Sequence, residues 1–130
     1  MTVVLDASAL LAVIQREPGQ QLVVDAIADG TVIGAANLAE VVTKLVEAGW
    51  PEARIRDAID PFATEVIALE ESQAYVTGLL RQATRSRGLS LGDRACLALA
   101  MRLGARVLTT DRNWRGVALD PPVEIVVIRD

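Results

Sequence analysis

Short apolar runs alternate with longer amphipathic segments along the whole chain. The first run, Thr2–Leu5, is β-branched and lacks polar alternation, which is typical of a strand buried on both faces of a parallel sheet. The segments between the runs are long enough for helical crossovers, which connect parallel strands. The pattern predicts an α/β fold: a mostly parallel five-stranded sheet with helices on both faces. The expected strands are Thr2–Leu5, Thr31–Gly34, Glu65–Leu69, Arg106–Thr109 and Val123–Ile128.

Start and stop signals predict helices in the intervening segments. Glycines follow the expected helix ends at Gly30, Gly49, Gly88 and Gly104. Two of the helices open with a capping residue three positions before an acid, which is typical of a capping box. Because there is neither an internal repeat nor a linker, we expect a single domain over residues 1–130. The expected helices are Ser8–Ile14, Pro18–Ala28, Asn37–Glu47, Pro51–Asp60, Glu71–Arg87 and Ser90–Leu103.

Composition narrows the classes of function. The chain has 130 residues, of which 52% are hydrophobic and only 3% aromatic. This predicts a packed aliphatic core, and it disfavours a module that binds nucleic acid by stacking bases on aromatic rings. The net charge of −4, from 17 acidic and 13 basic residues, argues against coating nucleic acid through bulk electrostatics.

Histidine is absent, and Cys96 is the one cysteine. This excludes Ser-His-Asp and Cys-His nucleophiles, a disulfide within the chain and a thiolate zinc cluster. Any bound metal would therefore have oxygen ligands. The segment Met1–Asp6 lacks the basic region of a signal peptide, and the apolar stretch Ala9–Ile14 is far shorter than the ~20 residues that cross a bilayer. We expect a cytoplasmic protein with no membrane segment.

Four acidic residues are the candidates for chemistry. Asp6 follows the first strand and Asp111 the fourth, so both lie at the carboxyl edge of a parallel sheet, where ligands bind in open α/β folds. Glu40 and Asp93 stand third in the two possible capping boxes. Each acid alone could simply cap a helix. However, all four lie at helix N-termini entering from one edge, which favours a shared acidic pocket over four independent caps.

Such a pocket requires a positive partner. Two carboxylates ~6 Å apart repel by about 3 kcal/mol at an effective dielectric constant of ~20, and four of them multiply the number of pairs. Either their pKa values rise or a divalent cation binds. Without histidine or a cysteine cluster, hard carboxylate oxygens favour Mg²⁺ or Mn²⁺.

The residues around these acids carry a family resemblance. They form the segments Asp6–Leu11 (DASALL), Asn37–Val41 (NLAEV), Leu91–Ala100 (LGDRACLALA) and Leu108–Arg112 (LTTDR). In order and spacing they resemble the PIN-domain ribonucleases, specifically the VapC-type toxins of toxin-antitoxin systems. The resemblance implies a parallel five-stranded sheet, bound Mg²⁺ or Mn²⁺ and endonucleolytic cleavage of RNA by a metal-activated water. It also implies a cognate antitoxin protein and a homodimer.

Residue roles follow from the same resemblance. It assigns catalysis to the quartet Asp6, Glu40, Asp93 and Asp111, with Asp6, Asp93 and Asp111 as metal ligands. Ser8 and Thr109 match supporting hydroxyl residues, while Asn113 stands where a number of relatives have a further acid. Basic side chains near the pocket should hold the RNA backbone. The candidates are Arg81, Arg85, Arg87, Arg94, Arg112 and Arg115.

Three alternatives compete with a nuclease. A haloacid-dehalogenase-type phosphatase needs a second Asp two residues after the first, but Ser8 occupies that position. A receiver domain needs a lysine near the last strand, but the only lysine is Lys44. A catalytically silent binding scaffold would use the apolar segment Ala9–Ile14 as an interface, although a helix buried between neighbours explains this segment equally well.

Overall fold

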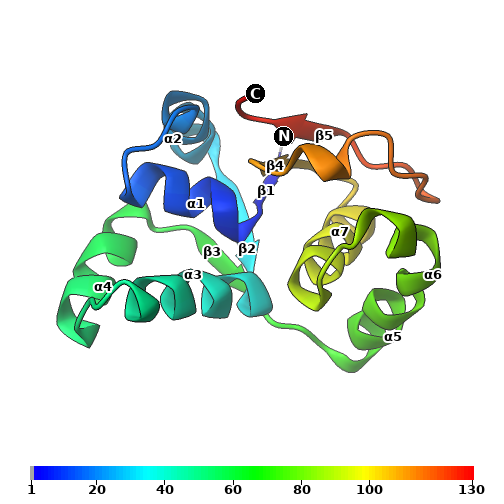
Figure 1. The fold of residues 1–130 in the computed structure, drawn as a ribbon, viewed down its shortest axis with the longest axis horizontal. Coiled ribbons are helices and arrows are strands. Elements are labelled where there is room, and N and C mark those ends of the chain that lie inside the picture. Colours follow the sequence, from blue (N-terminus) through cyan, green and yellow to red (C-terminus); the bar gives the residue numbers. More distant parts are fainter. Residues whose placement is uncertain (1) are drawn as a thin grey trace.

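The computed structural model describes residues 2–130 and contains one parallel five-stranded sheet. All four strand pairs are parallel, and the strand order is β3-β2-β1-β4-β5. The sheet lies between two groups of helices (Figure 1), so the predicted α/β class is confirmed. The strands are β1 (Val3–Leu5), β2 (Thr31–Gly34), β3 (Glu65–Ile67), β4 (Arg106–Thr109) and β5 (Ile125–Val127).

The helices lie on both faces of the sheet. In Figure 1, α1 to α4 lie on one side and α5 to α7 on the other. Within residues 2–130, no helix is both long and apolar enough to cross a membrane. The helices are α1 (Ala7–Ile14), α2 (Gln20–Asp29), α3 (Ala35–Glu47), α4 (Glu52–Ile59), α5 (Glu71–Leu79), α6 (Arg81–Thr84) and α7 (Leu91–Leu103). Short 3-10 helices cover η1 (Asp60–Phe62), η2 (Arg85–Arg87) and η3 (Arg112–Trp114).

Alternate residues of β1 enter two separate hydrophobic clusters. Val3 and Leu5 pack in the cluster with α1, α2 and α3, while Val4 packs with α7 in the other. Successive side chains of a strand point to opposite faces, so a strand covered on both sides must be apolar throughout. The apolar segment predicted to be either buried or an interface is mostly covered, because Ala9, Leu10 and Ala12 of α1 belong to the first cluster.

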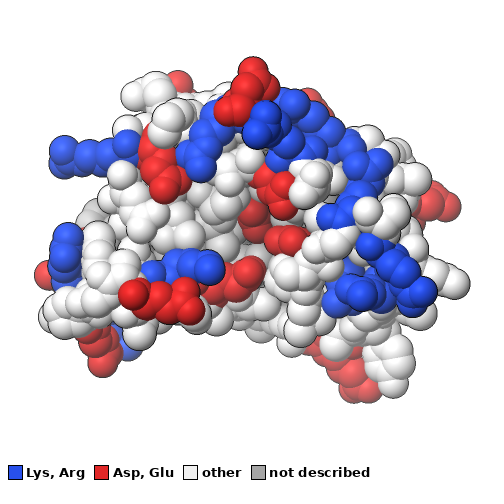
Figure 2. Space-filling model, viewed as in Figure 1, with Lys and Arg blue, Asp and Glu red and all other residues white. Residues whose placement is uncertain are grey.

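The strand order reverses at β1, and this positions the acidic residues. β1 pairs with β2 on one side and with β4 on the other, so the carboxyl ends of β1 and β4 are adjacent. The Asp6 backbone N–H continues the ladder by donating to the Leu108 carbonyl at 3.0 Å. On the face of the molecule that Figure 2 shows, acidic side chains gather near the middle, with basic side chains above them and to the right.

The two predicted capping boxes have different outcomes. The Ser90–Asp93 box is present at the start of α7, with Ser90 as the N-cap. The Asn37–Glu40 box is wrong, because α3 begins at Ala35 directly after β2, with Gly34 as its N-cap. Asn37 therefore lies inside the first turn and is fully buried, and its amide donates to the Glu40 side chain and the Gly92 carbonyl instead of capping α3.

The single long helix predicted for residues 71–87 is also wrong. The segment divides into α5, α6 and η2, with breaks near Leu80 and Thr84. The Thr84 hydroxyl donates to the Leu80 carbonyl at 2.8 Å, a back-bond that bends helices. Gly78 further lowers the helix propensity of this segment. The periodic pattern continues through these breaks, which is why it predicts one helix.

Candidate active site

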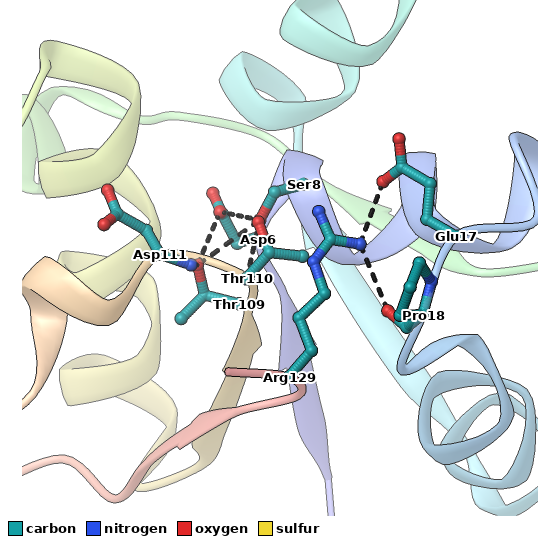
Figure 3. A network of polar contacts seen from close by, with 8 residues as sticks. All are labelled: Asp6, Ser8, Glu17, Pro18, Thr109, Thr110, Asp111 and Arg129. Carbon is teal, nitrogen blue, oxygen red and sulfur yellow. Dashed lines mark hydrogen bonds and ion pairs between the residues drawn. The ribbon is translucent and has the colours of Figure 1, made fainter.

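Asp6 lies at the start of the site, directly after β1, and only 4% of its surface is exposed. Its Oδ2 accepts hydrogen bonds from the Ser8 hydroxyl at 2.6 Å and from the Thr109 hydroxyl at 2.9 Å. Ser8 comes from the first turn of α1 and Thr109 from the end of β4, and both point at the carboxylate (Figure 3). Two hydroxyl donors on one oxygen compensate for burying this acid.

The same hydroxyls join the ends of β1 and β4. Ser8 Oγ accepts the Thr110 N–H at 3.0 Å, and Thr109 Oγ1 accepts the Asp111 N–H at 3.1 Å. Each hydroxyl thus accepts a backbone N–H and donates its own hydrogen to Asp6 Oδ2. Asp111 Oδ1 in turn accepts the Asn113 N–H at 2.9 Å, which turns the chain into η3. The placement of Asp6 and Asp111 is thus fixed by hydrogen bonds as well as by strand pairing.

The chain end also supports this side of the site. Arg129, which follows β5, donates from Nη1 to Glu17 Oε1 and to the Pro18 carbonyl, both at 3.1 Å (Figure 3). Next to this contact, Gly19 has a φ of +92°, and a Cβ there would lie 2.6 Å from the Ile128 carbonyl oxygen. The connection between α1 and α2 is therefore held against the end of β5.

Glu40 reaches the site from α3 and packs against the backbone of α7. Its Oε1 accepts a hydrogen bond from Asn37 Nδ2 at 3.0 Å. A Cβ at Gly92 would overlap the Glu40 carboxylate, so a glycine at this position leaves room for that group. The Glu40 carboxylate therefore lies directly against Gly92 in the first turn of α7.

Asp93 combines a capping role with a position at the site. Its Oδ2 accepts the Ser90 N–H at 2.8 Å, while its own N–H donates to Ser90 Oγ at 3.2 Å. The helix-capping interpretation of Asp93 is thus correct for one of its oxygens. The box also fixes the side chain, so the carboxylate is held at the N-terminus of α7, where negative charge is favourable.

The carboxylates of Asp6, Glu40, Asp93 and Asp111 line one open recess of about 330 Å³. Hydrogen bonds engage one oxygen each of Glu40, Asp93 and Asp111. Their second oxygens have no hydrogen-bond partner among residues 2–130. The other lining residues are Ala7, Ser8, Leu11, Lys44 and Thr110.

Burial and neighbouring charges disfavour the ionisation of three acids in this recess, Asp6, Glu40 and Asp93. Burial raises the pKa of Asp6, and the charge of Asp93 raises it further, against the lowering effect of the Ser8 and Thr109 hydrogen bonds. Burial also raises the pKa of Glu40, with additional contributions from Asp6 and Asp93. The pKa of Asp93 is raised first by burial and then by the charge of Asp111, against the hydrogen bonds from Ser90. The four acids therefore share one electrostatic field.

The donor chemistry of the recess suits a hard divalent cation. Carboxylate oxygens are the preferred protein ligands of Mg²⁺ and Mn²⁺, and a cation would offset both the burial of these charges and their mutual repulsion. Within residues 2–130, no three acids stand together as a ready-made ligand shell. Mg²⁺ usually keeps several waters and uses only one or two carboxylates, so the residues fit a partly hydrated ion.

Comparison with known proteins identifies the family. The family model of the PIN domain matches residues 3–119. The chain belongs to the PIN domain family. Members of this family are in general nucleases, which favours the nuclease prediction over the phosphatase and receiver alternatives.

Solved structures with the same fold include several toxin-antitoxin complexes. VapBC2 from Rickettsia felis, bound to a DNA fragment from its promoter, matches with a TM-score of 0.75 and 18% identity over 97% of this chain and 98% of that one. A toxin-antitoxin complex from Klebsiella pneumoniae matches with a TM-score of 0.74 and 19% identity over 97% of each chain. DNA-bound VapBC from Salmonella typhimurium matches with a TM-score of 0.73 and 19% identity over 97% of each chain. No curated protein matches by sequence.

Three of the predicted RNA-binding arginines make contacts within this PIN domain. Arg87 Nη1 donates to the carbonyls of Asn113 and Arg115 at 3.1 and 2.6 Å, which ties η2 to η3. Arg94 Nη1 donates to the Thr77 carbonyl at 3.1 Å, and Arg115 forms an ion pair with Asp130 at 3.3 Å.

The other three, Arg81, Arg85 and Arg112, are exposed, and their side chains form no hydrogen bond or ion pair with other residues in the range 2–130. None of the six predicted arginines lines the recess that residues 2–130 form. Asn113 is exposed, and its backbone rather than its side chain contacts Asp111.

Sequence reasoning missed Lys44 as part of the site. Lys44 lines the recess, its charge lowers the pKa of Glu40, and its Nζ lies 3.6 Å from Glu47 Oε1 at the surface. Residues four apart on a helix lie on the same face, so the spacing between Glu40 and Lys44 was a usable signal. The roles of Asn37 and Gly92 had no such signal, because they depend on how α3 meets α7.

Cys96 lies beneath the acids without being a nucleophile. It is fully buried in α7, and its pKa is well above the ordinary thiol value, first through burial and then through the charges of Asp6, Asp93 and Glu40. A reactive cysteine requires an accessible thiolate, so this thiol is part of the core.

Proposed function

We propose that this PIN domain is a Mg²⁺- or Mn²⁺-dependent endoribonuclease and the toxin of a toxin-antitoxin pair, acting in the cytoplasm. The observation that supports it is the convergence of four carboxylates on one recess at the point where the strand order reverses. Membership of a family of nucleases supports the reaction class. The absence of histidine leaves the carboxylates as the acid-base groups.

The residues of the recess would have different roles in the reaction. Asp6, Asp93 and Asp111 would hold the cation, directly or through its bound waters, since they come from the two adjacent strand ends and from the N-terminus of α7. A bound Mg²⁺ would neutralise phosphate charge and lower the pKa of an attacking water. Glu40, whose pKa is raised, would accept a proton from that water at Oε2, the oxygen not bonded to Asn37. Ser8 and Thr109 would keep Asp6 oriented during this step.

Basic side chains would hold the RNA backbone around this recess. Lys44 is a basic residue that lines the recess, and Arg81, Arg85 and Arg112 are exposed. Contacts of this kind position a nucleic acid without reading its sequence. We therefore expect RNA affinity to fall with salt as phosphate contacts are screened.

Substitution of the acids tests the nuclease. Asp93→Asn and Asp6→Asn should each abolish Mg²⁺- or Mn²⁺-dependent RNA cleavage while the variants remain folded by circular dichroism. A suitable control is Asp57→Asn, because Asp57 is an exposed acid on α4 outside the recess. Cleavage that persists in a chelator and in both variants would contradict the proposal, whereas a wild type that cleaves no RNA with either metal would favour a catalytically silent scaffold.

The partner proposal is that a cognate antitoxin protein binds this chain. Support comes from the matched structures, several of which are toxin-antitoxin complexes of the same fold. The test is to express the chain with and without its genomic neighbour and to compare complex size, RNA cleavage and cell growth. A neighbour that neither co-purifies nor reduces cleavage would overturn the toxin assignment while leaving the nuclease intact.

We also propose a homodimer, as the family resemblance implies. Tyr75 and Leu79 are 68% and 75% exposed and lie four residues apart on α5, so they share one helix face. Exposed apolar groups of this size on one face are typical of an interface with a second copy. Light scattering should show a dimer for the wild type and a monomer for Tyr75→Ser combined with Leu79→Ser. A monomeric wild type would contradict the proposal.

A further inference from the structure

One buried amide connects two helices to the proposed proton acceptor. Asn37 is fully buried, and its Nδ2 donates both to Glu40 Oε1 and to the Gly92 carbonyl, each at 3.0 Å. These two bonds use both hydrogens of the amide. They also fix its orientation, because a flipped amide would direct Oδ1 at two acceptors.

The opposite side of this amide borders a small cavity that Gln73 also lines. Asn37 Oδ1 and Gln73 Oε1 are both buried and have no hydrogen-bond partner among residues 2–130. Both residues line one small cavity of about 10 Å³, between α3, α5 and α7. Gly34 and Leu99 also line it, and Asn37 Oδ1 lies 3.1 Å from the position that a Gly34 Cβ would take. The oxygen is therefore on the cavity side of the amide.

We infer that this cavity binds a single water molecule, which donates one hydrogen to Asn37 Oδ1 and the other to Gln73 Oε1. Buried polar groups are nearly always satisfied, and the cavity has the size that holds one water. Two acceptors match the two donors of a water molecule. The water would fix the Oδ1 side of the Asn37 amide, while the Nδ2 side donates to Glu40. Asn37 and Gln73 are thus positioning residues for Glu40, a role that rests on the proposed function.

A high-resolution crystal structure of the metal-free wild-type protein tests the water directly. The expected result is one density peak within hydrogen-bond distance of both Asn37 Oδ1 and Gln73 Oε1. A dry cavity would overturn the inference, and so would a direct hydrogen bond from a reoriented Gln73 amide to Asn37. This measurement does not depend on RNA cleavage, so it stands even if the proposed function fails.

Kinetics test the positioning role. Gln73→Met removes the acceptor without shortening the side chain, so it should lower kcat for RNA cleavage several-fold with KM unchanged. Gln73→Glu keeps an acceptor at the same place and should restore kcat toward the wild-type value. The matched control is Gln82→Met, at an exposed glutamine of α6. Equal kcat values for Gln73→Met, Gln82→Met and the wild type would overturn the positioning role, as would a change confined to KM.

Discussion

A single missing Cβ determines where one of the four acids lies. The Glu40 carboxylate occupies the space that a side chain at Gly92 would fill, so a larger residue before Asp93 would have to displace this acid. Asn37 supports the same arrangement, because one amide bonds both Glu40 and the Gly92 carbonyl. The position of Glu40 is therefore a property of the contact between α3 and α7.

Gly92→Ala should separate activity from stability. Replacing glycine in a helix by alanine favours the helix by about 1 kcal/mol, but here the new Cβ must displace Glu40. We expect cleavage to fall on the order of 10²-fold, as for a small misplacement of a reacting group. Gly78→Ala is the matched control, since nothing lies within 4 Å of its Cβ. It should gain stability and keep full activity; equal activities of the two variants would contradict this account.

The acids should also make stability depend on pH with a predictable sign. The folded-state pKa values of Asp6, Glu40 and Asp93 are raised, so the folded protein binds more protons than the unfolded chain in that window. Stability should then fall as pH rises through the folded-state pKa values, from the ordinary carboxyl range upward.

Chemical denaturation of metal-free protein at several pH values measures this dependence. The wild type should be more stable at mildly acidic than at neutral pH, and Asp6→Asn should flatten that slope. The exposed-acid variant Asp57→Asn should keep the wild-type slope. A wild type whose stability rises toward neutral pH would show that the mutual repulsion is outweighed.

At the scale of elements, sequence signals worked where a local interaction fixes the end of a helix. The Ser90–Asp93 capping box was predictable because both partners lie within one turn. The start of α3 was not, because Asn37 bonds to Gly92, 55 residues away, instead of capping its own helix. The division of the segment 71–87 also escaped the pattern, since the hydrophobic periodicity continues through the breaks near Leu80 and Thr84.

Arg87 and Arg85 lie in the same 3-10 helix but should behave differently. Arg87 connects η2 to the carbonyls of Asn113 and Arg115, so Arg87→Gln should cost about 1 kcal/mol of stability and disturb the turn after Asp111. Arg85 is exposed, so Arg85→Gln should change stability by less than about 0.5 kcal/mol. Because Arg85 is a proposed phosphate contact, its loss should lower the salt slope of RNA binding by about one.

Denaturation curves and salt-dependent RNA binding of these two variants distinguish a structural tie from a nucleic-acid contact. Arg85→Gln would contradict the assignment if RNA binding kept the wild-type salt slope. Arg87→Gln would contradict it if the variant were as stable as the wild type and weakened only RNA binding.

For the whole molecule, the fold class was predictable because the strands and helices alternate along the chain. Parallel strands with helical crossovers bring Asp6 and Asp111 to one edge, and the structure has β1 and β4 adjacent. Contacts between distant elements were not predictable in the same way. Asn37 and Gly92 shape the recess only through the packing of α3 against α7.

The repulsion within the recess predicts how the whole molecule responds to metal. A cation that binds only the folded state stabilises it by RT ln(1 + [L]/Kd), about 2.7 kcal/mol at 100 times Kd. Millimolar Mn²⁺ should therefore raise the Tm of the wild type by several degrees. Asp6→Asn combined with Asp111→Asn removes two of the four charges, so this variant should melt higher than the wild type without metal and respond less to Mn²⁺.

The matched control for this measurement is Asp57→Asn combined with Glu71→Gln, which removes two exposed acids outside the recess and changes the net charge equally. It should keep the wild-type response to Mn²⁺, because the stabilisation depends on where the charges meet and not on the total charge. Thermal melts of the three proteins with and without metal provide the comparison. If the wild type does not respond under conditions that support cleavage, the recess does not hold the cation. If the control loses the response as fully as the recess variant, bulk charge is the cause.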